Sequence, residues 1–118
     1  MSRDHRKLHV FVIADSLVLE VYQASERFPP QERFGLQAQI RRSAISAACN
    51  IVEGSARRTT KEYVNFLNIA AGSAAEARYL AELSSRLGYI TPDAEQGLTK
   101  RYTELSARLQ VLIAALSS

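Results

Sequence analysis

The spacing of apolar residues predicts four amphipathic helices along this chain. Apolar side chains recur every three or four positions almost throughout, whereas the alternation of period two that is typical of strands is nearly absent. The predicted helices span about residues 8–27, 31–53, 60–87 and 92–116. The clearest apolar stripe lies in the last of them, at Leu98, Tyr102, Leu105, Leu109, Leu112 and Leu116.

Local sequence signals mark several helix ends. Thr91-Pro92 combines a hydroxyl cap with a proline at the first helical position, where the missing N–H has no intrahelical partner to lose. Thr59 and Glu62 have the spacing of a capping box, and Gly88 suits the left-handed residue that ends a helix. Pro29-Pro30 ends the first helix because the residue before a proline is disfavoured in the helical region.

The connections between the predicted helices are short, and Gly54-Ser55 is expected to close the second helix. Short connections make sequence neighbours antiparallel. The sequence therefore predicts an all-α fold, an antiparallel up-down-up-down four-helix bundle. We expect one domain over residues 1–118, with residues 1–5 and 117–118 frayed.

The first predicted helix is apolar over a wider arc than one bundle core covers. Besides the seam through Val10, Ala14, Leu17 and Val21, it carries further apolar residues at Leu8, Phe11, Val12, Val18, Leu19 and Tyr22. This helix could pack against two neighbours, or it could form a subunit interface. The interface is favoured, because a four-helix bundle has no central helix.

Composition narrows the class of protein. The 118 residues are 47% hydrophobic and 23% charged, which is typical of folded soluble domains, and no apolar run reaches the roughly 18 residues of a membrane span. We expect a cytoplasmic protein with no membrane contact. The single cysteine, Cys49, excludes a disulfide framework within the chain and is expected to be a buried structural thiol among small apolar neighbours.

Catalytic and metal-binding patterns are nearly absent from the sequence. His5 and His9 lie four residues apart and could form half of a metal site, but no third ligand is evident. Neither a glycine-rich phosphate loop nor a nucleophile with a nearby base is visible. We therefore expect no catalytic residue, no metal and no cofactor, and a protein that is not an enzyme.

Five polar residues fall beside apolar stripes. Asp15 lies among apolar positions of the first helix and would need a partner there, for which Arg41 or Arg42 of the antiparallel second helix is at a plausible height. Asn50 and Glu53 lie one turn apart near the small-residue stripe of the second helix. Buried polar groups of this kind commonly fix helix register, and contact with a ligand or partner is the alternative.

The positive charges are concentrated in the first half of the chain. Residues 1–61 hold ten Lys and Arg against six Asp and Glu, a net +4, whereas residues 62–118 hold five against six, a net −1. In the predicted bundle, six of these cations gather at one end, which we call the basic pole: Arg3, Arg6, Lys7, Arg57, Arg58 and Lys61. Such a cluster could bind RNA or DNA phosphates, or it could be an ordinary solvated helix end.

The middle of the chain carries an ordered series of motifs. These are Gln39-Ile40-Arg41-Arg42, Asn50-x-x-Glu53-Gly54 and Gly72-Ser73-x-x-Glu76. The series is similar to that of the four-helix-bundle proteins called 23S rRNA intervening-sequence proteins, over about residues 8–116. This sequence departs from the family pattern at Cys49 and at Ser55-Ala56, where the second helix is expected to end.

The resemblance implies an antiparallel bundle that assembles into a ring, usually a pentamer. It also suggests kinship with the accessory variability determinant of diversity-generating retroelements, a basic ring that works with a reverse transcriptase and nucleic acid. The leading hypothesis is therefore a homo-oligomer that contacts nucleic acid, or a nucleic-acid-processing protein, through the basic pole. The alternative is a protein-binding scaffold with no nucleic-acid contact.

Overall fold

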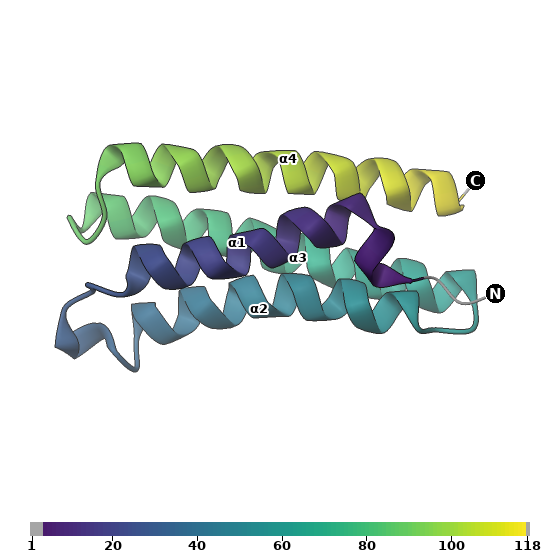
Figure 1. The fold of residues 1–118 in the computed structure, drawn as a ribbon, viewed down its shortest axis with the longest axis horizontal. Helices are drawn as coiled ribbons and strands as arrows, with labels where there is room; N and C mark the ends of the chain where they lie inside the picture. Colours follow the sequence, from purple (N-terminus) through teal and green to yellow (C-terminus); the bar gives the residue numbers. More distant parts are fainter. Residues whose placement is uncertain (1–3, 118) are drawn as a thin grey trace.

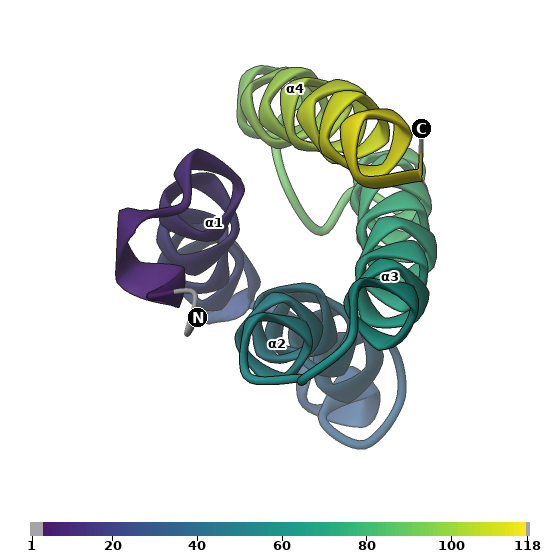
Figure 2. The same cartoon turned by 90° about the vertical axis from the view of Figure 1, so that its right-hand side faces the viewer.

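The computed structural model describes residues 4–117, and within this range the chain forms four α-helices and no strand. The helices are α1 (His9–Ser25), α2 (Leu36–Ser55), α3 (Thr60–Arg86) and α4 (Pro92–Ser117), with short 3₁₀ turns η1 (His5–Lys7) and η2 (Pro30–Glu32). Successive helices run in opposite directions around one core, and α1 closes the bundle against α4 (Figures 1 and 2). The predicted all-α four-helix bundle is confirmed. None of the helices among the described residues is long and apolar enough to span a membrane.

The main difference from the predicted helix boundaries is the start of α2, which is Leu36 rather than residue 31. Residues Pro30–Glu32 form the turn η2 instead, and the Oε1 atom of Glu32 accepts a hydrogen bond from the backbone N–H of Leu36 at 3.1 Å. A Cβ atom at Gly35 would lie 2.8 Å from this same Oε1 atom. Glycine at this position therefore leaves room for the carboxylate that caps the helix.

The caps predicted for the other helices are present. The Oγ1 atom of Thr59 accepts a hydrogen bond from the N–H of Glu62 at 3.1 Å, and Thr91 caps α4 through the N–H of Ala94 at 3.2 Å. Gly88 has φ of 79°, in the left-handed region that favours glycine. These local signals fix the two connections that flank α3.

The core is formed by the predicted inward faces of all four helices. Leu17, Leu105 and Leu109 are fully buried, together with Tyr102. On α3 the inward stripe is mostly alanine, and Ala70, Ala74, Ala77 and Ala81 are all fully buried. Small side chains let the backbones of neighbouring helices approach closely, so α3 packs tightly against α2 and α4.

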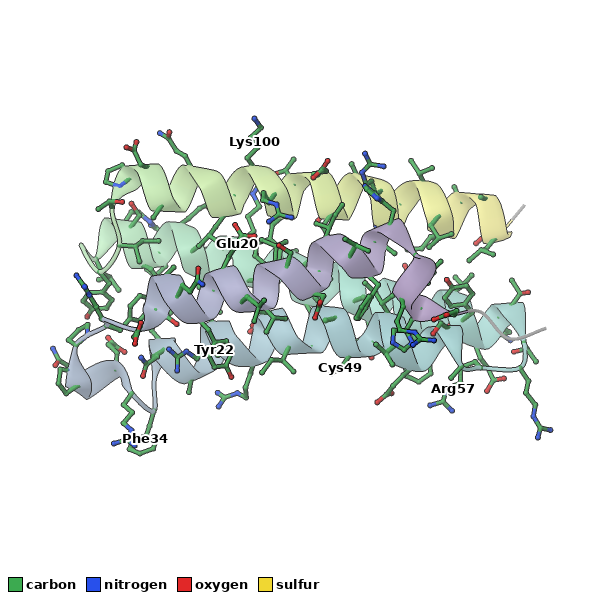
Figure 3. All side chains as sticks on the ribbon, viewed as in Figure 1. Glu20, Tyr22, Phe34, Cys49, Arg57 and Lys100 are labelled. Carbon is green, nitrogen blue, oxygen red and sulfur yellow. The ribbon has the colours of Figure 1, made fainter. Side chains whose placement is uncertain are left out.

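The prediction that Cys49 is a buried thiol is wrong, because Cys49 is exposed on α2 (Figure 3). Its neighbour Ala48 faces the core, and successive residues of a helix are about 100° apart around the axis. This rotation places Cys49 on the outer face of α2, where Ile45 is also exposed.

Candidate nucleic-acid interface

The amino-terminal turn η1 and the connection between α2 and α3 lie at the same end of the bundle (Figure 1), and η1 packs against α2. Arg6, Arg57, Arg58 and Lys61 are exposed there. Of the other two predicted members of the basic pole, Arg3 lies outside the described residues, and so does the side chain of Lys7. The structure thus brings four of the six predicted cations to one end.

Acidic neighbours partly neutralise this end. Asp4 accepts hydrogen bonds from Nε and Nη2 of Arg6 at 3.0 and 3.1 Å, and this hydrogen bonding, with the charge of Asp4, raises the pKa of the Arg6 guanidinium. The guanidinium of Arg57 lies 3.9 Å from the Glu53 carboxylate and over the ring of Phe66.

Of the described cations at this end, Arg58 and Lys61 have no acidic partner. Among residues 4–117, neither Arg58 nor Lys61 takes part in an ion pair, and both side chains are exposed. Both residues follow the end of α2, one in the turn and one in the first turn of α3. They are the cations of the basic pole best placed to accept an external phosphate.

The predicted pairing of Asp15 with Arg41 or Arg42 is wrong. Asp15 and Arg42 are both exposed, and so are Val12, Leu19 and Tyr22, three of the apolar residues near Asp15 on α1. Arg41 instead contacts the carboxyl end of α1: its Nε donates to Ser25 Oγ at 2.8 Å and its Nη2 to the Tyr22 carbonyl at 3.2 Å. A cation that binds the last carbonyls of a helix also interacts favourably with the helix dipole.

Asn50 is half-buried, whereas Glu53 is exposed beside Arg57, so the prediction of a buried Glu53 is also wrong. The Nδ2 atom of Asn50 donates to the carbonyl and the hydroxyl of Ser46, at 2.8 and 3.1 Å. The hydroxyls of Ser46 and Ser73 lie 2.8 Å apart, which carries this contact across to α3.

A carboxylate on α3 joins the same row of polar contacts. The Oε2 atom of Glu76 accepts hydrogen bonds from Ser43 Oγ at 2.8 Å and from Gln39 Nε2 at 3.3 Å. We call the complete row the polar ladder: Gln39, Ser43, Ser46, Asn50, Ser73 and Glu76. Of these, sequence reasoning singled out only Asn50 for such a role. The intervals of four, three and four residues that place Gln39, Ser43, Ser46 and Asn50 on one helix face are the signal that could have revealed the rest.

The outer face of α1 exposes large apolar side chains. Val12 and Leu19 are 52% and 64% exposed, and Tyr22, one turn after Leu19, is 39% exposed. The helical period places Val12 and Leu19 on one stripe, two turns apart. This apolar stripe is the part of the predicted wide arc that the bundle core does not cover.

Among the described residues, no further ligand joins His5 and His9, the pair that could form half of a metal site. The His5 ring instead packs edge-on against Phe11, with ring centroids 4.8 Å apart. Among residues 4–117 there is no cluster of three His, Cys, Asp or Glu side chains that could hold a metal ion.

Helices α1 and α4 are joined by a polar contact that the sequence did not indicate. Arg101 of α4 forms an ion pair with Glu20 of α1 and donates to Ser16 Oγ at 3.1 Å. The neighbouring Tyr102 is buried, and its hydroxyl has no hydrogen-bond partner within residues 4–117. Burial, followed by the charge of Glu20, raises the pKa of Tyr102.

Comparison with protein families matches residues 6–111 to the family described as 23S rRNA-intervening sequence protein. Among solved structures, the chain is similar to a protein of unknown function from the S23 ribosomal protein family of Bacteroides thetaiotaomicron. The two share 28% sequence identity with a TM-score of 0.82, over 88% of this chain and 97% of the other. Comparison with curated proteins finds no significant match.

Proposed function

We propose, from the premise that this chain belongs to the 23S rRNA-intervening sequence protein family, that it is a non-enzymatic homo-oligomer that contacts nucleic acid. The similar protein from Bacteroides thetaiotaomicron is itself of unknown function, so the similarity indicates a fold and not an activity. The proposal therefore depends on the exposed residues of this chain.

The nucleic-acid contact is supported by the basic pole, and above all by Arg58 and Lys61. Exposed cations without acidic partners attract phosphates because they can replace condensed counterions at little desolvation cost. In a ring of identical chains, several copies of this end would act on one strand, and multivalency would strengthen a contact that is weak for a single chain. The ring itself is an expectation from the family resemblance.

Assembly is supported by the apolar stripe of α1. Val12 and Leu19 expose more than half of their surface, and covering such side chains is a main driving force for association. We expect light scattering at micromolar concentration to return the mass of an oligomer, with a pentamer as the expected state. A monomer at that concentration would contradict this part of the proposal.

Electrophoretic retardation of RNA and DNA fragments tests the basic pole. The wild type should bind at low salt and release as salt rises, and a variant with Arg57, Arg58 and Lys61 all changed to Gln should bind at least tenfold more weakly, on the order of the loss expected for three phosphate contacts. A matched variant with Arg78, Lys100 and Arg108 changed to Gln removes three exposed cations elsewhere. Equal binding by all three proteins would refute the contact.

A protein-binding scaffold is the second candidate, and the same apolar stripe favours it, since a different protein could cover Val12 and Leu19. Affinity capture distinguishes the two functions. A single stoichiometric protein that stays bound after nuclease treatment, from a chain that retards no nucleic acid at low salt, would support the scaffold.

A further inference from the structure

A second candidate site lies at the end of the bundle opposite the basic pole. Figure 3 shows Phe34 and Arg57 at opposite ends of the molecule. Near Phe34, the start of α2 and the end of α1 enclose an open hollow of about 360 Å³. Its lining includes two aromatic rings and three guanidinium groups, from Tyr22, Phe34, Arg33, Arg41 and Arg42.

Phe34 is an aromatic ring that the fold does not cover. It is 87% exposed, more than any other large apolar side chain among the described residues, and it belongs to the short segment between η2 and α2. Because its side chain is almost entirely in solvent, Phe34 adds little to the stability of the bundle. Its ring is available as a flat platform at the rim of the hollow.

The arginines around Phe34 are not neutralised by the chain. Among residues 4–117, Arg33 and Arg42 form no ion pair, while Arg41 is held against α1 and lies over the Tyr22 ring at 4.3 Å. The guanidinium of Arg33 is 5.5 Å from the centre of the Phe34 ring, which places charge and platform together.

The two nearby carboxylates, of Glu32 and Glu26, do not line this hollow. Both oxygens of Glu32 accept hydrogen bonds, Oε1 from the N–H of Leu36 and Oε2 from the hydroxyl of Tyr89 at 3.0 Å. Glu26 lines the adjoining hollow with Gln23, outside the lining of this one. The hollow therefore presents positive charge beside an exposed ring.

We infer that this hollow binds an unpaired nucleotide of a single-stranded nucleic acid, with the base stacked on Phe34 and the flanking phosphates held by Arg33 and Arg42. Single-strand binding surfaces combine exactly these two elements, aromatic platforms for bases and cations for the backbone. A duplex buries its bases in its own stack and cannot use Phe34. An acidic peptide would use the guanidinium groups but gains little from the bare ring.

Fluorescence anisotropy with labelled uridine and deoxythymidine strands of about ten nucleotides, a usual length for a single-strand site, tests the inference. The change Phe34→Ala should weaken binding of the single strands by about tenfold and leave binding of a duplex of equal length unchanged. Phe34→Trp should restore single-strand binding. If Phe34→Ala loses the same affinity for the RNA strand as for the DNA strand, the protein contacts the base and the phosphates and not the 2′-hydroxyl.

The change Arg33→Gln with Arg42→Gln tests the phosphate contacts separately. The slope of log Kd against log salt for the single strand should fall by about 1.4, as expected for two lost contacts. The matched control is Tyr79→Ala with Arg86→Gln, because these residues form a similar exposed ring and guanidinium pair on α3, 5.9 Å apart. This control should leave both the affinity and the salt dependence unchanged.

Each outcome separates this site from the basic pole. Single-strand binding that depends on Arg58 and Lys61 but not on Phe34 overturns the inference and leaves the basic pole intact, and the reverse dependence supports the inference alone. Binding of a labelled polyglutamate peptide that is lost in Phe34→Ala, without any single-strand binding, also overturns it. A wild type that binds neither single strands nor duplex at low salt overturns both proposals, whereas a wild type that binds duplex alone overturns only this inference.

Discussion

Gly54 sits within α2 rather than after it, and its missing side chain brings α2 and α3 together. A Cβ atom there would lie 2.9 Å from Phe66 Cβ and 3.3 Å from the carbonyl oxygen of Tyr63. Neither of these atoms is the flexible end of a side chain, so the helices would have to separate. The sequence suggested a helix terminator at this position, but α2 continues to Ser55.

The change Gly54→Ala should therefore lower the free energy of unfolding by about 1–3 kcal/mol, because the overpacking exceeds the gain of about 1 kcal/mol in helix propensity. Denaturation by urea measures the change. Gly72→Ala is the control, since a Cβ there meets nothing within 4 Å, and it should stabilise the protein slightly. A Gly54→Ala protein as stable as the control would show that the two helices can move apart freely.

Tyr102 offers a second test at the scale of one residue. Its buried hydroxyl lacks a partner, so Tyr102→Phe should raise the free energy of unfolding by about 1 kcal/mol at neutral pH. Because the pKa of Tyr102 is raised in the folded state, the unfolded chain loses this proton first, above about pH 10, and stability falls there as pH rises. Melting curves from pH 7 to about pH 11 should show a smaller alkaline loss for Tyr102→Phe. The same slope in both proteins would contradict this.

At the scale of the elements, the polar ladder joins α2 to α3, and we expect it to fix their register. Asn50→Leu removes the amide that holds Ser46 opposite Ser73 and should lower stability by about 1 kcal/mol. Asn68→Leu is the matched control, because Asn68 makes the same contact to the carbonyl four residues earlier on an exposed face. The melting temperature and the oligomer mass check the result. If Asn50→Leu changed neither more than the control does, the ladder would have no part in register.

The α4 stripe is a second prediction for one element. Leu105 is fully buried, so Leu105→Ala should cost about 2–5 kcal/mol through lost transfer energy and a residual cavity. Val111→Ala removes a side chain of the same helix that is 72% exposed and should change stability by less than about 0.5 kcal/mol. Similar unfolding midpoints for the two variants would place the α4 stripe outside the core.

The features that the sequence predicted well were helix ends, which depend on residues close together in the chain. Thr59, Thr91 and Gly88 act within one or two turns of the chain, so their roles are readable from neighbours alone. Contacts between distant segments were not readable in this way. The contact of Arg41 with the carboxyl end of α1 depends on the position of α2 along the bundle axis, and the hollow around Phe34 depends on where α2 begins.

At the scale of the whole molecule, the proposed assembly predicts a change in mass. Leu19→Lys places a charge in the apolar stripe of α1 without touching the core, because Leu19 is 64% exposed. Sedimentation should show a shift toward monomer with an unchanged helical circular dichroism spectrum. Ile69→Lys changes a half-exposed apolar residue on α3 and should leave the mass unaltered. An oligomer that persists in Leu19→Lys would place the contact elsewhere.

The polar ladder also limits what membership of the family says about the function of a chain. Gln39, Asn50, Ser73 and Glu76 belong to the motifs by which the chain resembles its relatives, and their side chains meet one another between α2 and α3. Gly54, from the same motifs, serves that junction too. Most of these motif positions thus join two helices of one chain, although Arg42 and Glu53 of the same motifs are exposed. A likeness that rests on such a joint attests to a shared fold and leaves the task of the exposed surface undetermined.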